Sequence, residues 1–297
     1  MIKLEHTEVV GWEAAIRGMR NPMNSWDKSD STFSKHICSN TVCWTDISLN
    51  ELPPCNIPEE VHVDNWTGLF YNIGTNDHEL MTKLRNAGTD HRKFMRMIVV
   101  YLDITAPLYW WKEFKTYRAG RRFGDDEPDI IDDGYLECDI ETNSCSTMHK
   151  IHEKEFTLED FSYEHLTKGS VAVLEDTINA LNEARVWYLS WDYMSEKDRE
   201  NFDPGITCKK DLWWQMIQLL PSSYNQKRTI MLNYEVLANI YKSRKNHKLD
   251  EWVKFCKWIE SLPYSELITG VSLKDIPICN EIMEEAKRRV TNEENKK

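Results

Sequence analysis

The residues best suited to chemistry lie in the segment Thr229–Arg244, where an amide and a guanidinium stand eleven residues apart. The segment is strongly apolar, and its pattern predicts a helix. At about 100° per residue, Asn233 and Arg244 return to within about 20° of the same face and lie about 16 Å apart along the axis. An amide, a guanidinium and apolar contacts between them suit an extended, partly charged ligand. The apolar residues between them are Val236, Leu237 and Ile240.

A purely structural interpretation explains the same pattern. Asn233 would bond to backbone groups, and Arg244 would pair with a carboxylate such as Asp250. Spacing alone favours this interpretation. Asn239 is set roughly 120° away from Asn233 around the helix, so one face of a single chain does not easily present both amides.

Several other elements are needed to position this segment. Arg96–Thr105 is β-branched and apolar, which predicts a buried strand, and Ala106-Pro107 then opens a helix that runs to about Arg118. In Thr75–Ala87, Asn76 with Glu79 resembles a capping box, and Gly88 ends the helix. Further helices are predicted at Gly169–Tyr193, Asp211–Leu220 and Leu249–Leu262. The pattern as a whole predicts an α+β protein.

One stretch interrupts these elements. Gly120 to Thr142 holds six Asp and three Glu, which predicts a solvated loop or an insertion. The chain closes on a polar tail from residue 291. We expect a single domain over residues 1–297, with the acidic insertion at about 120–142.

Composition limits the classes of function. With 41% hydrophobic residues in 297, the chain can bury a sizeable core. A formal net charge of -12 disfavours nonspecific binding to duplex nucleic acid, because phosphate contacts need clustered Lys and Arg. We expect no secretory signal at Met1–Val10 and no membrane span, since the longest apolar run, Met97–Leu102, is far too short. These features predict a cytoplasmic protein.

The eight cysteines do not point to a metal site. They are scattered without a C-x-x-C pair, and Cys38 with Cys43 has no matching second pair. We therefore predict reduced thiols and no bound metal. The chain also lacks G-x-G-x-x-G, P-loop and nucleophile-elbow motifs. The pairs Trp110-Trp111 and Trp213-Trp214 are interpreted as helix-face core or subunit contacts.

Leu220 to Trp252 resembles the C-terminal signature of the flavin-dependent thymidylate synthases. That family has a Leu-Pro followed at a fixed interval by an Asn that starts a helix, then a second Asn and an Arg. Pro221, Asn233, Asn239 and Arg244 fall at these intervals without a gap. The resemblance implies that Asn233 and Asn239 contact the flavin. It also implies that Arg244 holds and helps to activate the pyrimidine.

A second region of resemblance spans Ile98 to Lys150. The family has a strand, Ala-Pro opening a helix, an R-H-R motif and a loop ending N-E-x-S-x-R-Y. Arg118, Asn143 and Ser146 match these motifs, and His91 matches a flavin-binding segment before the strand. The resemblance implies that Asn143, Arg118 and His91 bind cofactor, and that Ser146, Glu113 and Arg244 bind substrate.

The sequence departs from the family at arginine positions that hold nucleotide. Thr116, Met148, Ile217 and Glu235 stand where the family has Arg, and Tyr117 replaces the His of R-H-R. A planar bidentate donor to phosphate is hard to replace. Either other cations supply the phosphate contacts, or the ligand has changed. The candidate cations are Arg92, Lys93, Lys115, Arg121 and Arg122.

The resemblance implies a homotetramer with sites between subunits. In such a site, Asn233 and Asn239 need not lie on the same face of one chain. The implied reaction is reductive methylation of dUMP to dTMP. Methylenetetrahydrofolate supplies the carbon, and FAD reduced by NADPH supplies the hydride. Two alternatives stay open. One is a flavin enzyme of altered pyrimidine specificity, and the other is a non-catalytic descendant that keeps the scaffold and binds a partner or nucleotide.

Overall fold

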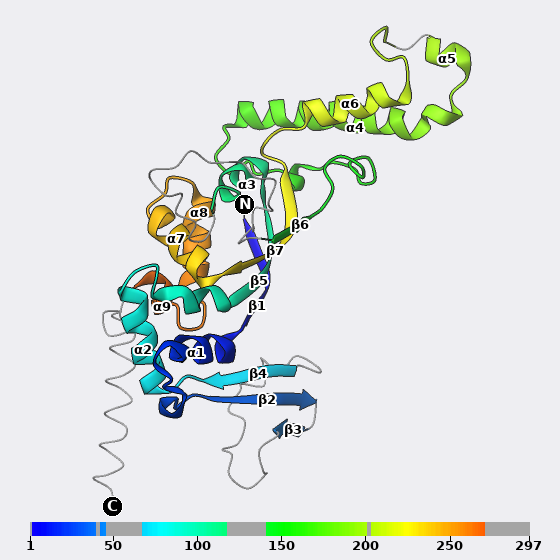
Figure 1. Ribbon diagram of the computed structural model, residues 1–297. Helices are drawn as coiled ribbons and strands as arrows, with labels where there is room; N and C mark the ends of the chain where they lie inside the picture. Colours follow the sequence, from blue (N-terminus) through cyan, green and yellow to red (C-terminus); the bar gives the residue numbers. More distant parts are fainter. Residues whose placement is uncertain (1, 40–41, 46–66, 118–140, 201–202, 271–297) are drawn as a thin grey trace, which may run out of the picture. The chain divides into compact units, whose positions relative to one another are not determined.

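The computed structural model describes residues 2–39, 42–45, 67–117, 141–200 and 203–270 (Figure 1). The chain divides into two compact units, each described by itself below. The first comprises Met1–Glu8, Val100–Leu232 and Val236–Ser265, and the second comprises Val9–Val99, Asn233–Glu235 and Glu266–Lys297. Two units are compatible with one domain or two, so the single-domain organisation stays a prediction. Most of the acidic insertion and all of the tail from 291 lie outside the described residues.

A four-stranded sheet forms the centre of the first unit. Its strands lie in the order β1-β5-β7-β6, with bounds Lys3–Val10, Val99–Pro107, Asn225–Asn233 and Glu141–Ser144. β5 is the strand predicted at Arg96–Thr105. It begins three residues later than predicted because Arg92–Met97 form a 3₁₀ turn. β6 runs antiparallel to β7, which places Asn143 opposite Thr229.

The predicted helix at Thr229–Arg244 is wrong in its first part. Residues up to Asn233 belong to β7, and α7 occupies only Tyr234–Arg244. Side chains in β7 alternate between buried and more exposed positions, as the two-residue period of a strand predicts. Asn233 therefore ends a strand, and its predicted place on one helical stripe with Arg244 is wrong.

An aromatic core packs between α3 (Leu108–Phe114) and α8 (Asp250–Glu260). The Trp110 ring lies 4.8 Å from that of Trp252 and 4.9 Å from that of Phe114, with centroids as the reference points. Trp110 and Trp111 are buried, which confirms them as core residues. The helix predicted at Leu249–Leu262 is confirmed as α8. α3 ends at Phe114, short of Arg118, because the chain then tightens into a turn in which Thr116 donates to the Glu113 carbonyl.

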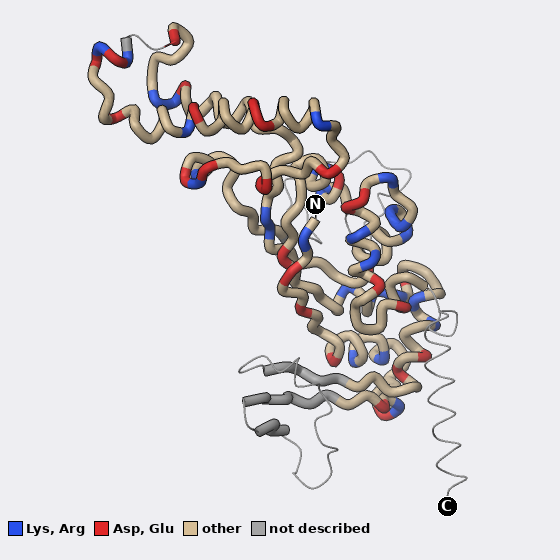
Figure 2. Tube along the Cα trace, turned by 180° about the vertical axis from the view of Figure 1, so that it is seen from behind, with Lys and Arg blue, Asp and Glu red and all other residues tan. Residues whose placement is uncertain are grey.

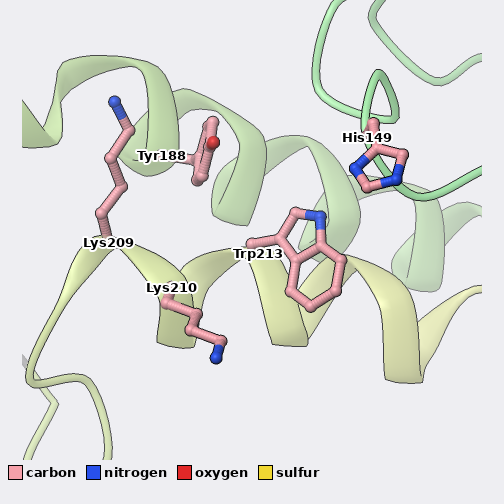
Figure 3. A pocket seen from close by; sticks show the side chains of 5 residues that line it. All are labelled: His149, Tyr188, Lys209, Lys210 and Trp213. Atoms are coloured by element: carbon pink, nitrogen blue, oxygen red, sulfur yellow. The ribbon is translucent and has the colours of Figure 1, made fainter.

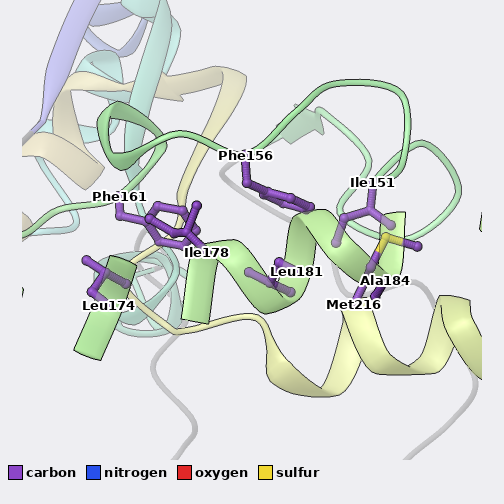
Figure 4. Close-up of a cluster of buried hydrophobic side chains, with 8 residues drawn as sticks. All are labelled: Ile151, Phe156, Phe161, Leu174, Ile178, Leu181, Ala184 and Met216. Atoms are coloured by element: carbon purple, nitrogen blue, oxygen red, sulfur yellow. The ribbon is translucent and has the colours of Figure 1, made fainter. Parts of the chain in front are cut away.

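A second core of the first unit lies along α4 (Lys168–Ser190) and α6 (Lys209–Leu219) (Figure 4). Both helices were predicted, and the short α5 (Glu196–Glu200) lies between them in sequence. Leu174, Ile178 and Leu181 recur at three-to-four spacing and are buried, as an amphipathic helix requires. The remaining buried members of the cluster are Ile151, Phe156, Phe161, Ala184 and Met216.

The second unit holds three helices and a small sheet. The helices α1, α2 and α9 span Trp12–Arg20, Thr75–Asn86 and Glu266–Thr269. The antiparallel strands β2, β3 and β4 span Thr32–Ser39, Val42–Thr45 and Thr67–Asn72, in the order β3-β2-β4. α1 packs on the 3₁₀ turn Arg92–Met97 through Gly11, whose φ is 93°. A Cβ at Gly11 would collide with the Met97 carbonyl oxygen, so only glycine fits there.

α2 begins differently from the prediction. Gly74 is its N-cap, and the Asn76–Glu79 capping box does not form. The Asp30 carboxylate caps the helix instead, accepting from Asn76 N at 2.9 Å and from Asp77 N at 3.1 Å. A cap supplied from 46 residues away leaves no local pattern in the helix sequence.

Residues of both charge signs are spread along the described chain. Figure 2 shows Lys and Arg interspersed with Asp and Glu over the described elements. Among the helices of this part of the chain, none is both long enough and apolar enough to cross a bilayer.

Candidate functional site

Arg244 is the centre of a side-chain cluster in the first unit. It lies at the end of α7, and its side chain is 21% exposed. Its Nη1 lies 3.3 Å from Glu113 Oε2, and its Nε donates to the Tyr117 hydroxyl. The pairing partner suggested by sequence, Asp250, instead contacts His165 at 3.0 Å. The structure thus brings together Glu113 and Arg244, which lie far apart in the sequence and were both predicted to bind substrate.

The guanidinium lies over two aromatic rings. The Arg244 Cζ lies 5.0 Å from the Trp252 ring centroid and 5.4 Å from that of Tyr117. Both distances are within the range of a cation–π contact. Trp252 Nε1 also donates to Glu113 Oε2 at 3.0 Å, so one carboxylate oxygen binds both the ring and the guanidinium. These contacts orient Arg244 before any ligand arrives.

The cluster retains unused hydrogen-bonding capacity. Among the described residues, Arg244 Nη2 and Glu113 Oε1 have no hydrogen-bond partner. A guanidinium has five N–H donors, and a carboxylate oxygen accepts more than one bond. The site therefore offers one strong donor and one strong acceptor, on side chains already held in place.

The other predicted residues of the first unit lie on or near the sheet and α7. Asn143 is exposed in β6, and Asn239 is partly buried in α7. Ser146 follows β6, and its Oγ accepts from Met148 N at 3.2 Å and from His149 N at 2.8 Å. The Ser146 hydroxyl closes its own turn, and its hydrogen stays available to a ligand acceptor.

In the second unit, Asn233 is buried and His91 is exposed. Glu235, which stands where the family has Arg, is fully buried. Its carboxylate binds Arg92 Nε at 3.2 Å and also binds Arg96 Nε. A buried carboxylate needs such partners to offset the cost of its desolvation. Arg92, proposed from sequence as a cation for phosphate, is therefore engaged in an ion pair.

The remaining family arginine positions supply no cation. Ile217 is partly buried against the α4–α6 core, Met148 is exposed, and Thr116 donates its hydroxyl to the Glu113 carbonyl at 2.7 Å. Of the other candidate cations, Lys93 and Lys115 are exposed. Arg118, Arg121 and Arg122 lie outside the described residues.

Sequence reasoning missed two members of the Arg244 cluster. Tyr117 was noted only as a departure from the R-H-R motif, yet its hydroxyl and ring both contact Arg244. Trp252 was interpreted as core, and it is buried, but its ring also lies 5.0 Å from the Arg244 Cζ.

Cys145, Cys208 and Cys256 are free thiols, and of these Cys256 is buried. Burial raises the pKa of the Cys256 thiol to about 11, which disfavours the nucleophilic thiolate. Within the described ranges, no group of three or more His, Cys, Asp or Glu is arranged to hold a metal ion.

Comparison with known proteins shows which solved structures this fold resembles. No family model matches the sequence, and no curated protein matches it. Among solved structures, thymidylate synthase X from Helicobacter pylori, determined with FAD and dUMP, aligns with a TM-score of 0.50 at 14% identity, covering 91% of this chain and 98% of that chain. Another structure of the same enzyme, also with FAD and dUMP, aligns with a TM-score of 0.49 at 15% identity over the same shares. This mixed helix and sheet fold therefore resembles that of a flavin-dependent thymidylate synthase.

Proposed function

We propose that this chain is a divergent flavin-dependent thymidylate synthase that converts dUMP to dTMP by reductive methylation. Methylenetetrahydrofolate would supply the carbon, and NADPH would be the reductant. The enzyme would act in the cytoplasm as a homotetramer with sites between subunits. The fold likeness and the unbroken spacing of Pro221, Asn233, Asn239 and Arg244 support this proposal.

The observation that carries the proposal is the pre-oriented pair of Arg244 and Glu113. Uracil presents a ring N–H beside a carbonyl oxygen, so it needs an acceptor beside a donor. Glu113 Oε1 and Arg244 Nη2 offer these two groups, and Glu113 lies 3.3 Å from the guanidinium. A guanidinium on a carbonyl oxygen also draws electron density from the ring, which favours attack at the reacting carbon. Tyr117 and Trp252 limit the motion of the guanidinium, which lowers the entropic cost of binding.

The proposed cofactor fits the available side chains in part. The isoalloxazine edge carries acceptors and donors that amides can match, and Asn233 and Asn239 would bind it. Asn143, His91 and Arg118 would complete the cofactor set. FAD, when bound, would supply the redox chemistry, while the chain's residues bind and orient the substrate. The fit is weakest at Glu235, where a buried anion bound to Arg92 and Arg96 replaces an arginine.

A second candidate function is a flavin enzyme of altered pyrimidine specificity. The observation that favours it is the loss of cations at Met148, Ile217 and Glu235. Each charge-assisted hydrogen bond to a phosphate is worth about 1.5–3 kcal/mol, so several losses without replacement would remove micromolar binding of dUMP. In that case the enzyme would bind FAD and act on a different pyrimidine.

The cofactor is tested by titrating the full chain with FAD and following flavin absorbance and fluorescence. We expect saturable binding, weakened about tenfold by Asn239→Ala through the lost amide bonds. Asn246→Ala is the matched control, because Asn246 is exposed just beyond α7, and it should bind FAD as the wild type does. A protein that binds no FAD would be the non-catalytic scaffold, and both enzyme proposals would fail.

A further inference from the structure

Two polar side chains lie on the core face of β7 and take no part in the Arg244 cluster. Gln226 and Arg228 are 6% and 7% exposed, and the next inward positions of the strand are the buried Ile230 and Leu232. Among the described residues, no carboxylate forms an ion pair with Arg228. Burying a charge costs free energy unless the charge is paired and hydrogen-bonded. Core packing alone therefore does not account for an arginine at this position.

Arg228 is held by a side-chain amide and by an aromatic ring. Its Nε and Nη2 donate to Gln226 Oε1 at 3.0 and 2.7 Å, and its Cζ lies 4.2 Å from the Trp111 ring centroid. Trp111 Nε1 donates to the backbone carbonyl of Gln226 at 3.0 Å. A guanidinium has no acceptor, so the oxygen of the Gln226 amide must face Arg228. The nitrogen of the same amide is thereby directed elsewhere.

The Gln226 amide connects Arg228 to the turn after β6. Gln226 Nε2 donates to the Cys145 carbonyl at 2.6 Å, and Cys145 N donates to the Lys227 carbonyl at 3.0 Å. Because Arg228 fixes which end of the amide faces the turn, the bond to Cys145 depends on the guanidinium as well as on Gln226.

The same turn is held at its other end by α6. Trp213 Nε1 donates to the Met148 carbonyl at 2.8 Å. Trp213 and His149 also line the hollow drawn in Figure 3. Inside the turn, the Ser146 Oγ accepts from Met148 N and from His149 N. The turn 145–149 is therefore anchored at both ends, with the Ser146 hydroxyl between the two anchors.

We propose that Arg228 is a positioning residue, which fixes the Gln226 amide and so holds the turn 145–149 where Ser146 meets the substrate. The inference rests on the proposed function, in which the family resemblance makes Ser146 a substrate contact. Loss of Arg228 leaves Gln226 Oε1 buried without its donor, so the amide rotates and releases the Cys145 carbonyl. The turn must then be ordered when the substrate binds, which lowers the affinity.

Gln226→Glu tests the connection directly, because it keeps an oxygen for Arg228 and removes the donor to Cys145. With the full chain, FAD, NADPH and methylenetetrahydrofolate, the KM for dUMP should rise about tenfold while kcat changes less than about twofold. Arg228→Met should give the same shift, and Arg228→Lys, which retains a donor, should restore part of it. The control is Gln215→Glu, the same substitution at an exposed position of α6, which should leave both constants unchanged.

A second measurement does not depend on turnover. Amide hydrogen exchange in a peptide covering 145–149 should be faster in Gln226→Glu and Arg228→Met than in the wild type or in Gln215→Glu. Unchanged exchange in both variants would overturn the positioning of the turn, whatever the wild type does with dUMP. Faster exchange with an unchanged KM would overturn the role in substrate binding. Faster exchange in a chain whose wild type does not convert dUMP would support the positioning of the turn and contradict the proposed function.

Discussion

Arg244 is a side chain whose surroundings prepare it for a ligand. Glu113 and Tyr117 bind it from α3 and the turn that follows, and Trp252 covers it from α8. An arginine that merely solvated a surface would not need partners from α3, from the turn after it and from α8. Pre-orientation of this kind is what a binding or catalytic group requires.

Replacing Arg244 tests this interpretation at the residue scale. Arg244→Ala should lower nucleotide-dependent kcat/KM by about 100-fold or more, because the substrate loses its guanidinium donor. The melting temperature should change little, since the side chain is partly exposed. Arg17→Ala removes an exposed arginine of α1 and serves as the control for kinetics and melting. Unchanged kcat/KM in Arg244→Ala would remove the substrate assignment.

Asp77 provides a residue-scale prediction about stability. It is fully buried, and its carboxylate accepts 2.6 Å bonds from Arg20, Ser29 and Ser31. Burial disfavours the charged form, but these bonds outweigh it and hold the pKa of Asp77 below its usual value of 3.8. A carboxyl group whose pKa is lower in the folded state than in the unfolded state stabilises the folded state at pH values above the unfolded pKa. This stabilisation is lost as the pH falls through the folded pKa.

Two measurements follow from the Asp77 bonds. The free energy of unfolding should fall as pH drops below about 4, and this slope should shrink in Asp77→Asn. At neutral pH, Asp77→Asn should cost about 3–5 kcal/mol in urea unfolding, because Arg20 is left buried without its anion. The control is Asp27→Asn, at an exposed aspartate of the same unit. Identical pH profiles for Asp77→Asn and the wild type would contradict the assignment.

At the scale of elements, sequence patterns predicted the helices that carry continuous apolar stripes. They failed where the secondary structure depends on pairing with residues distant in the sequence. α4 and α8 were predicted because Leu174, Ile178 and Leu181, or Trp252 and Ile259, recur at helical spacing. β7 was taken for a helix because its apolar residues run directly into α7, and only its pairing with β5 and β6 separates the two.

The candidate site was predictable only through family resemblance. Glu113 and Arg244 lie 131 residues apart, and no periodicity relates residues at that distance. Asp30, which caps α2 from 46 residues away, escaped prediction for the same reason. Tyr117 and Trp252 carried no motif, so only the tertiary structure shows them around Arg244.

The α4–α6 core gives a prediction at the element scale. Leu181 is fully buried between the two helices, so Leu181→Ala should lower the free energy of unfolding by about 2–5 kcal/mol. Val173 lies on the same helix and is 65% exposed, so Val173→Ala should change stability by less than about 0.5 kcal/mol. Urea titrations of both variants measure the difference. Equal losses would show that α4 does not bury the face described here.

At the scale of the whole molecule, the fold resembles that of thymidylate synthase X, whereas the sequence is largely different. The likeness to thymidylate synthase X covers 91% of this chain at 14% identity. By the sequence resemblance, Met148, Ile217 and Glu235 stand where the flavin-dependent thymidylate synthases have arginines. A shared fold does not fix the reaction, so the outcome depends on whether dUMP is still bound.

The release of tritium from dUMP labelled at C5 tests this most directly, because methylation replaces the hydrogen on that carbon. The full chain would be supplied with FAD, NADPH and methylenetetrahydrofolate. We predict that tritium enters water and dTMP forms in equal amounts, and that omitting FAD stops both. A chain that binds FAD but leaves the label on dUMP would contradict the proposed reaction.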